Sequence, residues 1–175
     1  MRVVAGELKG RRLASPPRRS ADVRPTSDRA REALFSILGE VTGARVLDLF
    51  CGTGALGIEA ISRGAASAVL VDSEPRLARR NVADLALSDR CEVVRSDALR
   101  YLAAAEDRFD LVLCDPPYAL AGRIGPELER LVPRRLAKGG RLVVESPARE
   151  PVELDLPMLA ERRFGEALVR IWTAT

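Results

Sequence analysis

The sequence predicts an α/β fold with a mostly parallel, doubly wound sheet of seven strands and helices on both faces. The chain has 175 residues, a length typical of one domain. Two observations support the fold class. Strand and helix patterns alternate beyond residue 45, and the strands are continuous runs of Val and Leu, as expected of parallel strands buried on both faces. The last two strand patterns flank Gly165 and predict a terminal antiparallel hairpin.

The residues ahead of the sheet predict a small extension made of a β-hairpin and a helix. Residues 2–6 and 10–13 are expected as two short strands around a glycine-bearing turn, followed by an extended link over 15–20. The helix is expected to begin near Thr26 or Ser27, whose hydroxyl groups can cap it.

The alternating part of the chain is predicted from its hydrophobic periodicity and its glycine and proline positions. The predicted strands are 46–49, 68–71, 91–94, 109–114, 142–145, 159–164 and 167–173. The predicted helices are 55–63, 75–87, 98–105 and 125–136, the last of them ending before Gly139 and Gly140.

The composition excludes several classes of site. The chain has no histidine, so Ser-His-Asp triads, imidazole metal ligands and histidine bases are excluded. Its three cysteines, Cys51, Cys91 and Cys114, form no CxxC pair, which excludes a zinc ribbon. No apolar run reaches the roughly 18 residues of a membrane span. We therefore expect a cytoplasmic protein with reduced thiols that binds neither a metal nor a membrane.

The net charge of +3 is unevenly distributed. Residues 1–31 hold nine basic and three acidic residues, a net charge of +6, which leaves −3 for the rest of the chain. Eight of the nine are arginines, which pair with phosphates and stack on bases. A basic arm on a mildly acidic body predicts a polyanionic partner that docks at one end, and we expect RNA. The predicted RNA-binding residues are Lys9, Arg11, Arg12, Arg18, Arg19, Arg24, Arg29 and Arg31.

A glycine loop follows the first predicted strand of the sheet. Gly52, Gly54 and Gly57 satisfy GxGxxG between a strand and a helix, where glycine allows a tight turn and close approach of a ligand. Asp72 ends the next strand, 20 residues after Gly52, where a carboxylate can accept both ribose hydroxyls. Together these features predict a nucleotide site.

The acids around this loop decide between two classes of nucleotide. The pyrophosphate of NAD would place negative charge at the helix N-terminus, whereas S-adenosylmethionine offers an ammonium and a sulfonium group. Asp48 precedes the loop, and Asp97, which can also cap a helix, follows the third strand. These acids favour S-adenosylmethionine, with Asp97 and the Ala98 N–H facing adenine. The predicted cofactor residues are Asp48, Phe50, Gly52, Thr53, Gly54, Asp72, Ser73, Asp97 and Ala98.

The tetrapeptide Asp115-Pro116-Pro117-Tyr118 follows the fourth strand and predicts the chemistry. Two successive prolines make the loop rigid and remove two backbone donors. The Asp115 carboxylate and the Pro116 carbonyl can then accept the two N–H groups of an exocyclic amine, and Tyr118 can stack on its base. Asp115 would also stabilise the positive charge that develops on nitrogen during methylation. All four residues are predicted to be catalytic.

These motifs resemble the bacterial 16S ribosomal RNA guanine-N2 methyltransferases across essentially the whole chain. The glycine loop and the Asp-Pro-Pro-Tyr tetrapeptide are shared by many amino-methylating enzymes, and the N-terminal motifs are the restrictive ones. The resemblance is carried by residues 2–6 and 9–11, 24–26, 29, 31–35, 48–50, 52–57 and 115–118.

The resemblance implies a Rossmann-like class I methyltransferase fold and the transfer of a methyl group from S-adenosylmethionine to one guanine N2 of the small subunit. We expect residues 1–175 to form a single methyltransferase domain, with residues 1–25 as its basic RNA-binding extension. The expected substrate is 16S ribosomal RNA within a small-subunit particle, and the expected state is a monomer.

Other functions stay open from the sequence. An adenine-N6 methyltransferase acting on DNA or RNA would use the same chemistry. A protein-glutamine methyltransferase is disfavoured because such sites typically begin with Asn where this chain has Asp115. GxGxxG alone also allows a dehydrogenase, and the basic arm alone allows a non-catalytic RNA-binding assembly factor.

Overall fold

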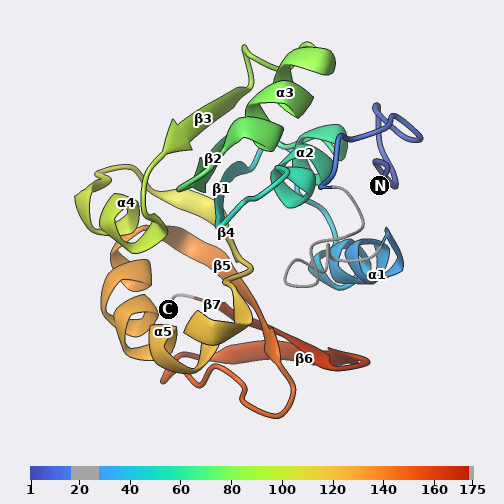
Figure 1. The fold of residues 1–175 in the computed structure, drawn as a ribbon. Helices are drawn as coiled ribbons and strands as arrows, with labels where there is room; N and C mark the ends of the chain where they lie inside the picture. The colour runs from blue at the N-terminus through green and yellow to red at the C-terminus, as the bar shows by residue number, and fades with distance from the viewer. Residues whose placement is uncertain (17–27, 174–175) are drawn as a thin grey trace.

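The computed structural model describes residues 1–16 and 28–173 and contains one seven-stranded sheet (Figure 1). The strand order is β3-β2-β1-β4-β5-β7-β6. The first five strands in this order, β3, β2, β1, β4 and β5, pair in parallel. Strand β7 pairs antiparallel with both β5 and β6, so the sheet is mostly parallel with a terminal antiparallel hairpin, as the sequence predicts. The strands are β1 Arg45–Leu49, β2 Ser67–Asp72, β3 Cys91–Arg95, β4 Phe109–Cys114, β5 Leu136–Pro147, β6 Met158–Phe164 and β7 Ala167–Thr173.

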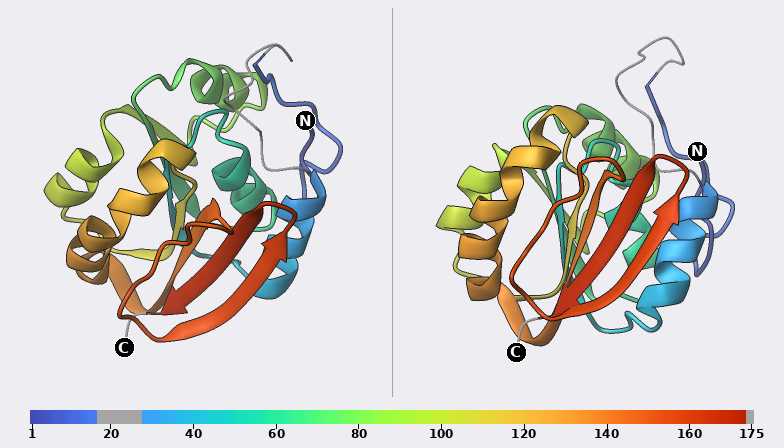
Figure 2. Two further views of the ribbon diagram at one scale, coloured as in Figure 1. Left: turned by 60° about the horizontal axis from the view of Figure 1, so that its bottom comes forward. Right: turned by 90° about the horizontal axis from the view of Figure 1, so that it is seen from below.

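Helices cover both faces of the sheet (Figures 1 and 2). Helices α1, α2 and α3 lie on one face, and α4 and α5 lie on the other. The helices are α1 Asp28–Leu38, α2 Ala55–Ser62, α3 Arg76–Asp84, α4 Ala98–Ala104 and α5 Tyr118–Leu131, which continues into the 3-10 turn η1 Val132–Arg134. None of the helices in the described part of the chain is both long and apolar enough to cross a bilayer.

The core consists of two apolar layers, one on each face of the sheet. Neighbouring strand residues alternate between them: Val46 packs with the α1–α3 layer, and Leu47 packs with the α4–α5 layer. Both are at most 1% exposed. Burial on both faces explains why the sequence shows continuous apolar runs at the central strands.

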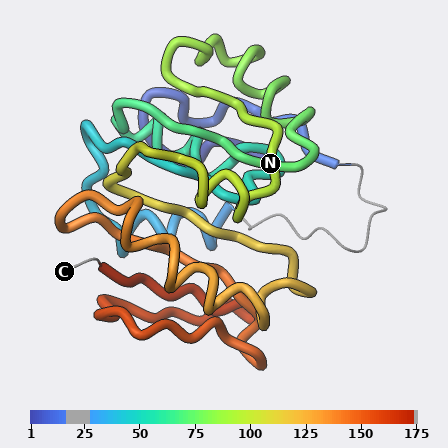
Figure 3. Tube along the Cα trace, turned by 90° about the vertical axis from the view of Figure 1, so that its left-hand side faces the viewer, coloured from blue at the N-terminus to red at the C-terminus, as the bar shows by residue number. Residues whose placement is uncertain are grey.

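Strand direction and burial differ between the two edges of the sheet (Figure 3). The β6–β7 hairpin lies at the opposite end of the sheet from β3 and α3. Strand β6 has a mostly exposed burial pattern, whereas β1 is buried at four of its five residues. The terminal hairpin predicted around Gly165 is therefore confirmed as an antiparallel edge.

The largest differences from the predicted boundaries are at the start of α5 and the start of β5. Helix α5 begins at Tyr118 rather than near residue 125 and includes Pro126, although proline removes a helical hydrogen bond. Gly139 and Gly140 do not end a helix. They lie inside β5, where the pairing register with β4 shifts between Phe109 and Leu111. Glycine here accommodates a bulge rather than a helix end.

The predicted N-terminal hairpin is reduced to one bridge, between Arg2 and Arg12. Backbone bonds in which Val3 donates to Arg11 (3.0 Å) and Gly10 donates to Val3 (2.9 Å) preserve the antiparallel course. The expectation of two regular strands was wrong because the segment bonds to helix α2 instead of extending its own ladder. Thr26 and Ser27, the expected caps of α1, lie outside the described residues.

Candidate cofactor and substrate site

One pocket of about 920 Å³ lies at the carboxyl ends of the parallel strands. The sheet order places the β1–α2 and β4–α5 loops side by side, because strand order reverses between β1 and β4. Ligands of open α/β sheets bind in such a crevice. The pocket is lined by twelve of the thirteen predicted cofactor and catalytic residues: Asp48, Phe50, Gly52, Thr53, Asp72, Ser73, Asp97, Ala98, Asp115, Pro116, Pro117 and Tyr118.

The glycine loop has the backbone geometry that its sequence predicts. Gly52 and Gly54 have positive φ angles of 53° and 77°, and Gly54 is the N-cap of α2. A Cβ atom at Gly57 would lie 2.2 Å from Leu70 Cδ2, so only glycine lets α2 approach β2 this closely. Phe50 also has a positive φ of 59°, a strained conformation at a residue that lines the pocket.

Asp48 lies beneath this loop and is 1% exposed. Its Oδ2 atom accepts a hydrogen bond from the Gly57 backbone N–H at 2.9 Å. Among the described residues, nothing donates to its buried Oδ1 atom. Burial raises the pKa of Asp48 to about 7; the Gly57 bond opposes this shift, and the charge of Asp72 adds to it. A cation in the pocket would stabilise the ionised form of this carboxyl.

Asp72 and Asp97 face the same pocket from the ends of neighbouring strands. Asp72 accepts from the backbone N–H groups of Gly52 (2.9 Å) and Glu74 (2.8 Å), which fixes its carboxylate against the glycine loop. Asp97 is the N-cap of α4 and accepts from the Arg100 N–H at 2.8 Å. Each carboxylate has more acceptor positions than these contacts use.

The Asp-Pro-Pro-Tyr loop is shorter than the sequence suggests, because Pro117 is already the N-cap of α5. Asp115 is half-buried, Pro116 is buried, and Tyr118 is 42% exposed at the pocket. Cys114 lies behind the loop, and burial raises its pKa well above the usual value. Its thiol is therefore held protonated, and the side chain packs in the buried core as a free cysteine.

The acidic groups of the pocket fit S-adenosylmethionine. Seven carboxyl groups line it, and four of them, from Asp48, Asp72, Asp97 and Asp115, belong to the predicted site residues. They suit a ligand with an ammonium and a sulfonium group. The buried Oδ1 atom of Asp48 is an acceptor position for such a cation. A pyrophosphate would instead meet this set of negative charges.

The predicted RNA-binding residues fall into three groups. Lys9, Arg11, Arg12 and Arg29 are exposed, so their charges can reach phosphates. Arg18, Arg19 and Arg24 lie outside the described residues. Arg31 corrects the prediction: its side chain is fully buried, and its Nη2 donates to the Arg2 carbonyl (2.6 Å) and to Asp28 Oδ1 (2.7 Å). It holds α1 against the N-terminal segment instead of facing a phosphate.

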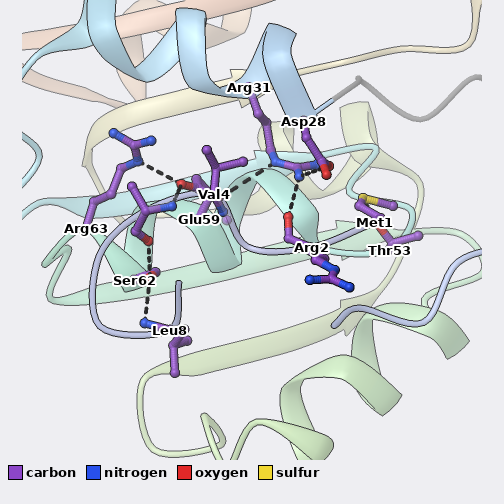
Figure 4. Close-up of polar contacts among 12 residues, drawn as sticks. Met1, Arg2, Val4, Leu8, Asp28, Arg31, Thr53, Glu59, Ser62 and Arg63 are labelled. Carbon is purple, nitrogen blue, oxygen red and sulfur yellow. Dashed lines mark hydrogen bonds and ion pairs between the residues drawn. The ribbon is translucent and has the colours of Figure 1, made fainter. Parts of the chain in front are cut away.

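The N-terminal segment, residues 1–14, lies along α2 and is bonded to it at two places (Figure 4). Buried Glu59 accepts from the backbone N–H groups of Val4 (2.8 Å) and Ala5 (3.0 Å). Ser62 Oγ accepts from the Leu8 N–H at 2.9 Å. A Cβ atom at Gly6 would lie 1.7 Å from the Ser62 carbonyl oxygen, so glycine is needed for this close approach.

Several pocket residues were missed by the sequence prediction. One group of them comes from the end of β5, the residues after it, and the β6–β7 hairpin, which the sheet order brings beside the Asp-Pro-Pro-Tyr loop. Arg149 and Arg163 are exposed there, and both carry charges suited to phosphate. No local pattern marks them, because their role depends on strand pairing across the sheet. The missed residues are Met1, Pro16, Cys51, Ala55, Leu56, Glu74, Leu77, Leu120, Glu145, Pro147, Ala148, Arg149, Arg163 and Glu166.

Comparison with known proteins supports this fold. The family described as Conserved hypothetical protein 95 matches residues 1–173. The ribosomal RNA small subunit methyltransferase D of Escherichia coli is 39% identical over 121 residues, which cover 67% of this chain and 60% of that protein. The chain thus matches less than two thirds of that relative's length.

Solved structures agree over a larger part of the chain. The Escherichia coli protein yhhF superposes with a TM-score of 0.83 at 32% identity, covering 99% of this chain and 97% of that one. The N-methyltransferase NodS of Bradyrhizobium japonicum superposes with a TM-score of 0.67 at 16% identity, covering 87% and 98%. The predicted Rossmann-like class I methyltransferase fold is confirmed.

Proposed function

This chain belongs to the Conserved hypothetical protein 95 family, and from that premise we propose that it transfers a methyl group from S-adenosylmethionine to the exocyclic N2 of a guanine in small-subunit ribosomal RNA. One observation carries the proposal. The glycine loop and Asp115-Pro116-Pro117-Tyr118 line one pocket, from adjacent strands β1 and β4. This arrangement supports a cofactor and an amine acceptor that meet there.

The cofactor would lie along the glycine loop. Asp72, at the end of β2, would accept the ribose hydroxyls, and Asp97 with the Ala98 N–H would face the adenine. Asp48 would lie nearest the positive groups. When bound, S-adenosylmethionine would supply an electrophilic methyl group, and breakage of its sulfur–methyl bond would release S-adenosylhomocysteine.

The acceptor amine would be held by Asp115 and the Pro116 carbonyl. The lone pair of an exocyclic nitrogen is delocalised into its ring, so the amine is a weak nucleophile until its geometry changes. Hydrogen bonds from the two N–H groups of the amine to the Asp115 carboxylate and the Pro116 carbonyl would fix the nitrogen with its lone pair toward the methyl group. The Asp115 carboxylate would stabilise the positive charge that grows on nitrogen, and Tyr118 would stack on the base.

No strong base is required for this reaction. The nitrogen loses its proton readily once it carries the methyl group and a positive charge, so water can accept the proton. This fits a chain that has no histidine and whose Cys114 thiol is held protonated.

The RNA substrate is supported by charge and by the named relative. Residues 1–25 would dock RNA as a basic extension of a single methyltransferase domain. Within residues 1–16, the part of this extension that the structure describes, Lys9, Arg11 and Arg12 are exposed. The Escherichia coli relative is named for the small ribosomal subunit, which favours 16S ribosomal RNA, as part of that particle, as the substrate. A guanine splayed out of its stack could enter the open pocket.

Calorimetry with the purified chain tests the cofactor and the enzyme class. We expect S-adenosylhomocysteine, the demethylated cofactor, to bind and NAD to give no heat of binding. Incubation with radiolabelled S-adenosylmethionine and small ribosomal subunits should then transfer label to RNA. NAD binding without S-adenosylhomocysteine binding would indicate a dehydrogenase, and RNA binding without cofactor would indicate an assembly factor.

A further inference from the structure

Asn81 on α3 is a buried polar residue outside the site described above, with 1% exposure. Its side-chain amide makes three hydrogen bonds to two separate segments. Oδ1 accepts from the Ala14 N–H at 2.7 Å, and Nδ2 donates to the Ala14 carbonyl at 3.1 Å. Nδ2 also donates to the Thr53 carbonyl at 2.9 Å. One side chain thus joins the N-terminal segment to the glycine loop.

A second contact between the same two segments lies close by. Met1 Sδ is 4.0 Å from Thr53 Oγ1, and the Leu13 N–H donates to the Met1 carbonyl at 3.1 Å. Met1 therefore lies beside Thr53 (Figure 4), and Ala14 is joined to Thr53 through Asn81. Met1 and Thr53 both line the pocket.

The N-terminal segment does not depend on Asn81 for its attachment to the body. Glu59 and Ser62 already bind it at Val4, Ala5 and Leu8, along α2. What Asn81 adds is a link between Ala14 and the Thr53 carbonyl. This link acts on the loop, because Thr53 lies between Gly52 and Gly54, two residues with positive φ angles and little conformational restriction of their own.

We propose that Asn81 is a positioning residue for the cofactor, which holds the Thr53 carbonyl, and with it the glycine loop, against the N-terminal segment. The inference rests on the cofactor of the proposed function. A site made of glycine backbone needs support from residues whose own rotamers are locked, and a fully hydrogen-bonded buried amide gives that support.

A linkage follows from this arrangement. If the Asn81 amide couples the loop to the segment, cofactor binding at the loop also stabilises the segment, and the effect is reciprocal. The segment carries exposed Lys9, Arg11 and Arg12, so RNA docked there would act on the cofactor loop through the same contact.

Substitution of Asn81 tests the proposal with S-adenosylhomocysteine alone, without RNA. Asn81→Asp keeps the shape of the side chain and the acceptor for Ala14, but replaces both donors with an oxygen that faces two carbonyl groups. We expect about tenfold weaker binding by calorimetry, because two hydrogen bonds are lost. Arg80→Ala, which removes an exposed neighbour on the same helix, should bind within about twofold of the unaltered chain.

Hydrogen exchange separates positioning from a general loss of stability. In the unaltered chain, S-adenosylhomocysteine should slow amide exchange in residues 1–14, the Ala14 amide included. Asn81→Asp should abolish this cofactor-induced protection, whereas Arg80→Ala should retain it. If Asn81→Asp gives no cooperative melt, Asn81→Ser keeps one donor and should show an intermediate loss of affinity.

The outcomes are distinguishable. Equal affinity and equal protection in the unaltered chain and a folded Asn81 variant would overturn the positioning role and leave the proposed function intact. Failure of the unaltered chain to bind S-adenosylhomocysteine would overturn both.

Discussion

The two sides of the pocket are built differently. On the cofactor side, formed by the glycine loop and the ends of β2 and β3, carboxylates bond to backbone: Asp48 to Gly57 and Asp72 to Gly52, both at 2.9 Å. On the acceptor side, formed by the β4–α5 loop, the end of β5 and the β6–β7 hairpin, side chains such as Tyr118 and Arg163 are exposed. The cofactor side is thus preorganised, whereas the acceptor side presents groups that a large substrate can cover.

The largest effect should come from the acceptor side, at Asp115. Asp115→Ala should lower the rate of methyl transfer about 10²–10³-fold, because the charge that grows on the amine loses its carboxylate. Binding of S-adenosylhomocysteine should change less than about threefold, since the cofactor side is intact. Single-turnover kinetics and calorimetry measure the two quantities.

The matched control is Asp89→Ala, which removes an exposed acid at the amino end of β3, away from the pocket. Its turnover should equal that of the unaltered chain. A near-normal single-turnover rate in Asp115→Ala would remove Asp115 from the mechanism.

Asp72 should give the opposite pattern. Asp72→Ala removes the acceptor of the Gly52 and Glu74 N–H groups and the expected ribose ligand, so affinity for S-adenosylhomocysteine should fall about 30- to 100-fold. Calorimetry checks this against Glu92→Ala, an exposed acid on neighbouring β3 that should bind normally. Unchanged affinity in Asp72→Ala would contradict the assigned cofactor side.

The basic residues should give a smaller effect that appears only with RNA. Arg149→Gln with Arg163→Gln on the acceptor side, and Arg11→Gln with Arg12→Gln on the N-terminal segment, should each weaken binding of 16S ribosomal RNA several-fold. Each pair of substitutions should make the negative slope of log affinity against log salt less steep by about 1–2. Filter binding across a salt series measures both quantities.

Arg134→Gln with Lys138→Gln is the control for these pairs, because it removes the same charge from the amino end of β5. Equal salt slopes for all three pairs would show that neither surface docks the RNA phosphates.

The smallest effect should be a pH dependence of stability at Asp48. Its folded pKa of about 7 lies above the ordinary value of 3.8, so the folded state keeps a proton that the unfolded state loses. Stability without cofactor should therefore decline between about pH 4 and 7 and be level above that range. Asp48→Asn should flatten this decline and raise Tm at pH 8 by several degrees. Melting curves with the same pH slope in both proteins would contradict the raised pKa.

The cofactor side could be predicted from the sequence because its signals are local. Gly52, Gly54 and Gly57 lie within six residues, and the bond from the Gly52 N–H to Asp72 confirms the expected closeness of the loop and the second strand. Both features follow from one strand–helix–strand unit, β1–α2–β2. The sheet class and the buried strands were likewise predictable from apolar runs, apart from the strand ends, whereas the mostly exposed β6 was predicted from its place in a hairpin around Gly165.

The acceptor side and the N-terminal segment could be predicted only in part, because they depend on contacts between distant residues. Arg149 and Arg163 reach the pocket through the pairing of β5, β7 and β6. Arg31 carried one usable signal: it shares a helical face with Leu34, Phe35 and Leu38, all buried. The charge of Arg31 suggested a contact with RNA, whereas its position in the apolar repeat of the helix indicated burial.

Identification of the methylated nucleoside tests the central claim most directly. Small ribosomal subunits from cells that lack this gene are incubated with the purified chain and S-adenosylmethionine, and the 16S RNA is digested and analysed by mass spectrometry. The account predicts N2-methylguanosine at one position, absent when Asp115→Ala is used. N6-methyladenosine, or no new methylated nucleoside in the RNA, would contradict it.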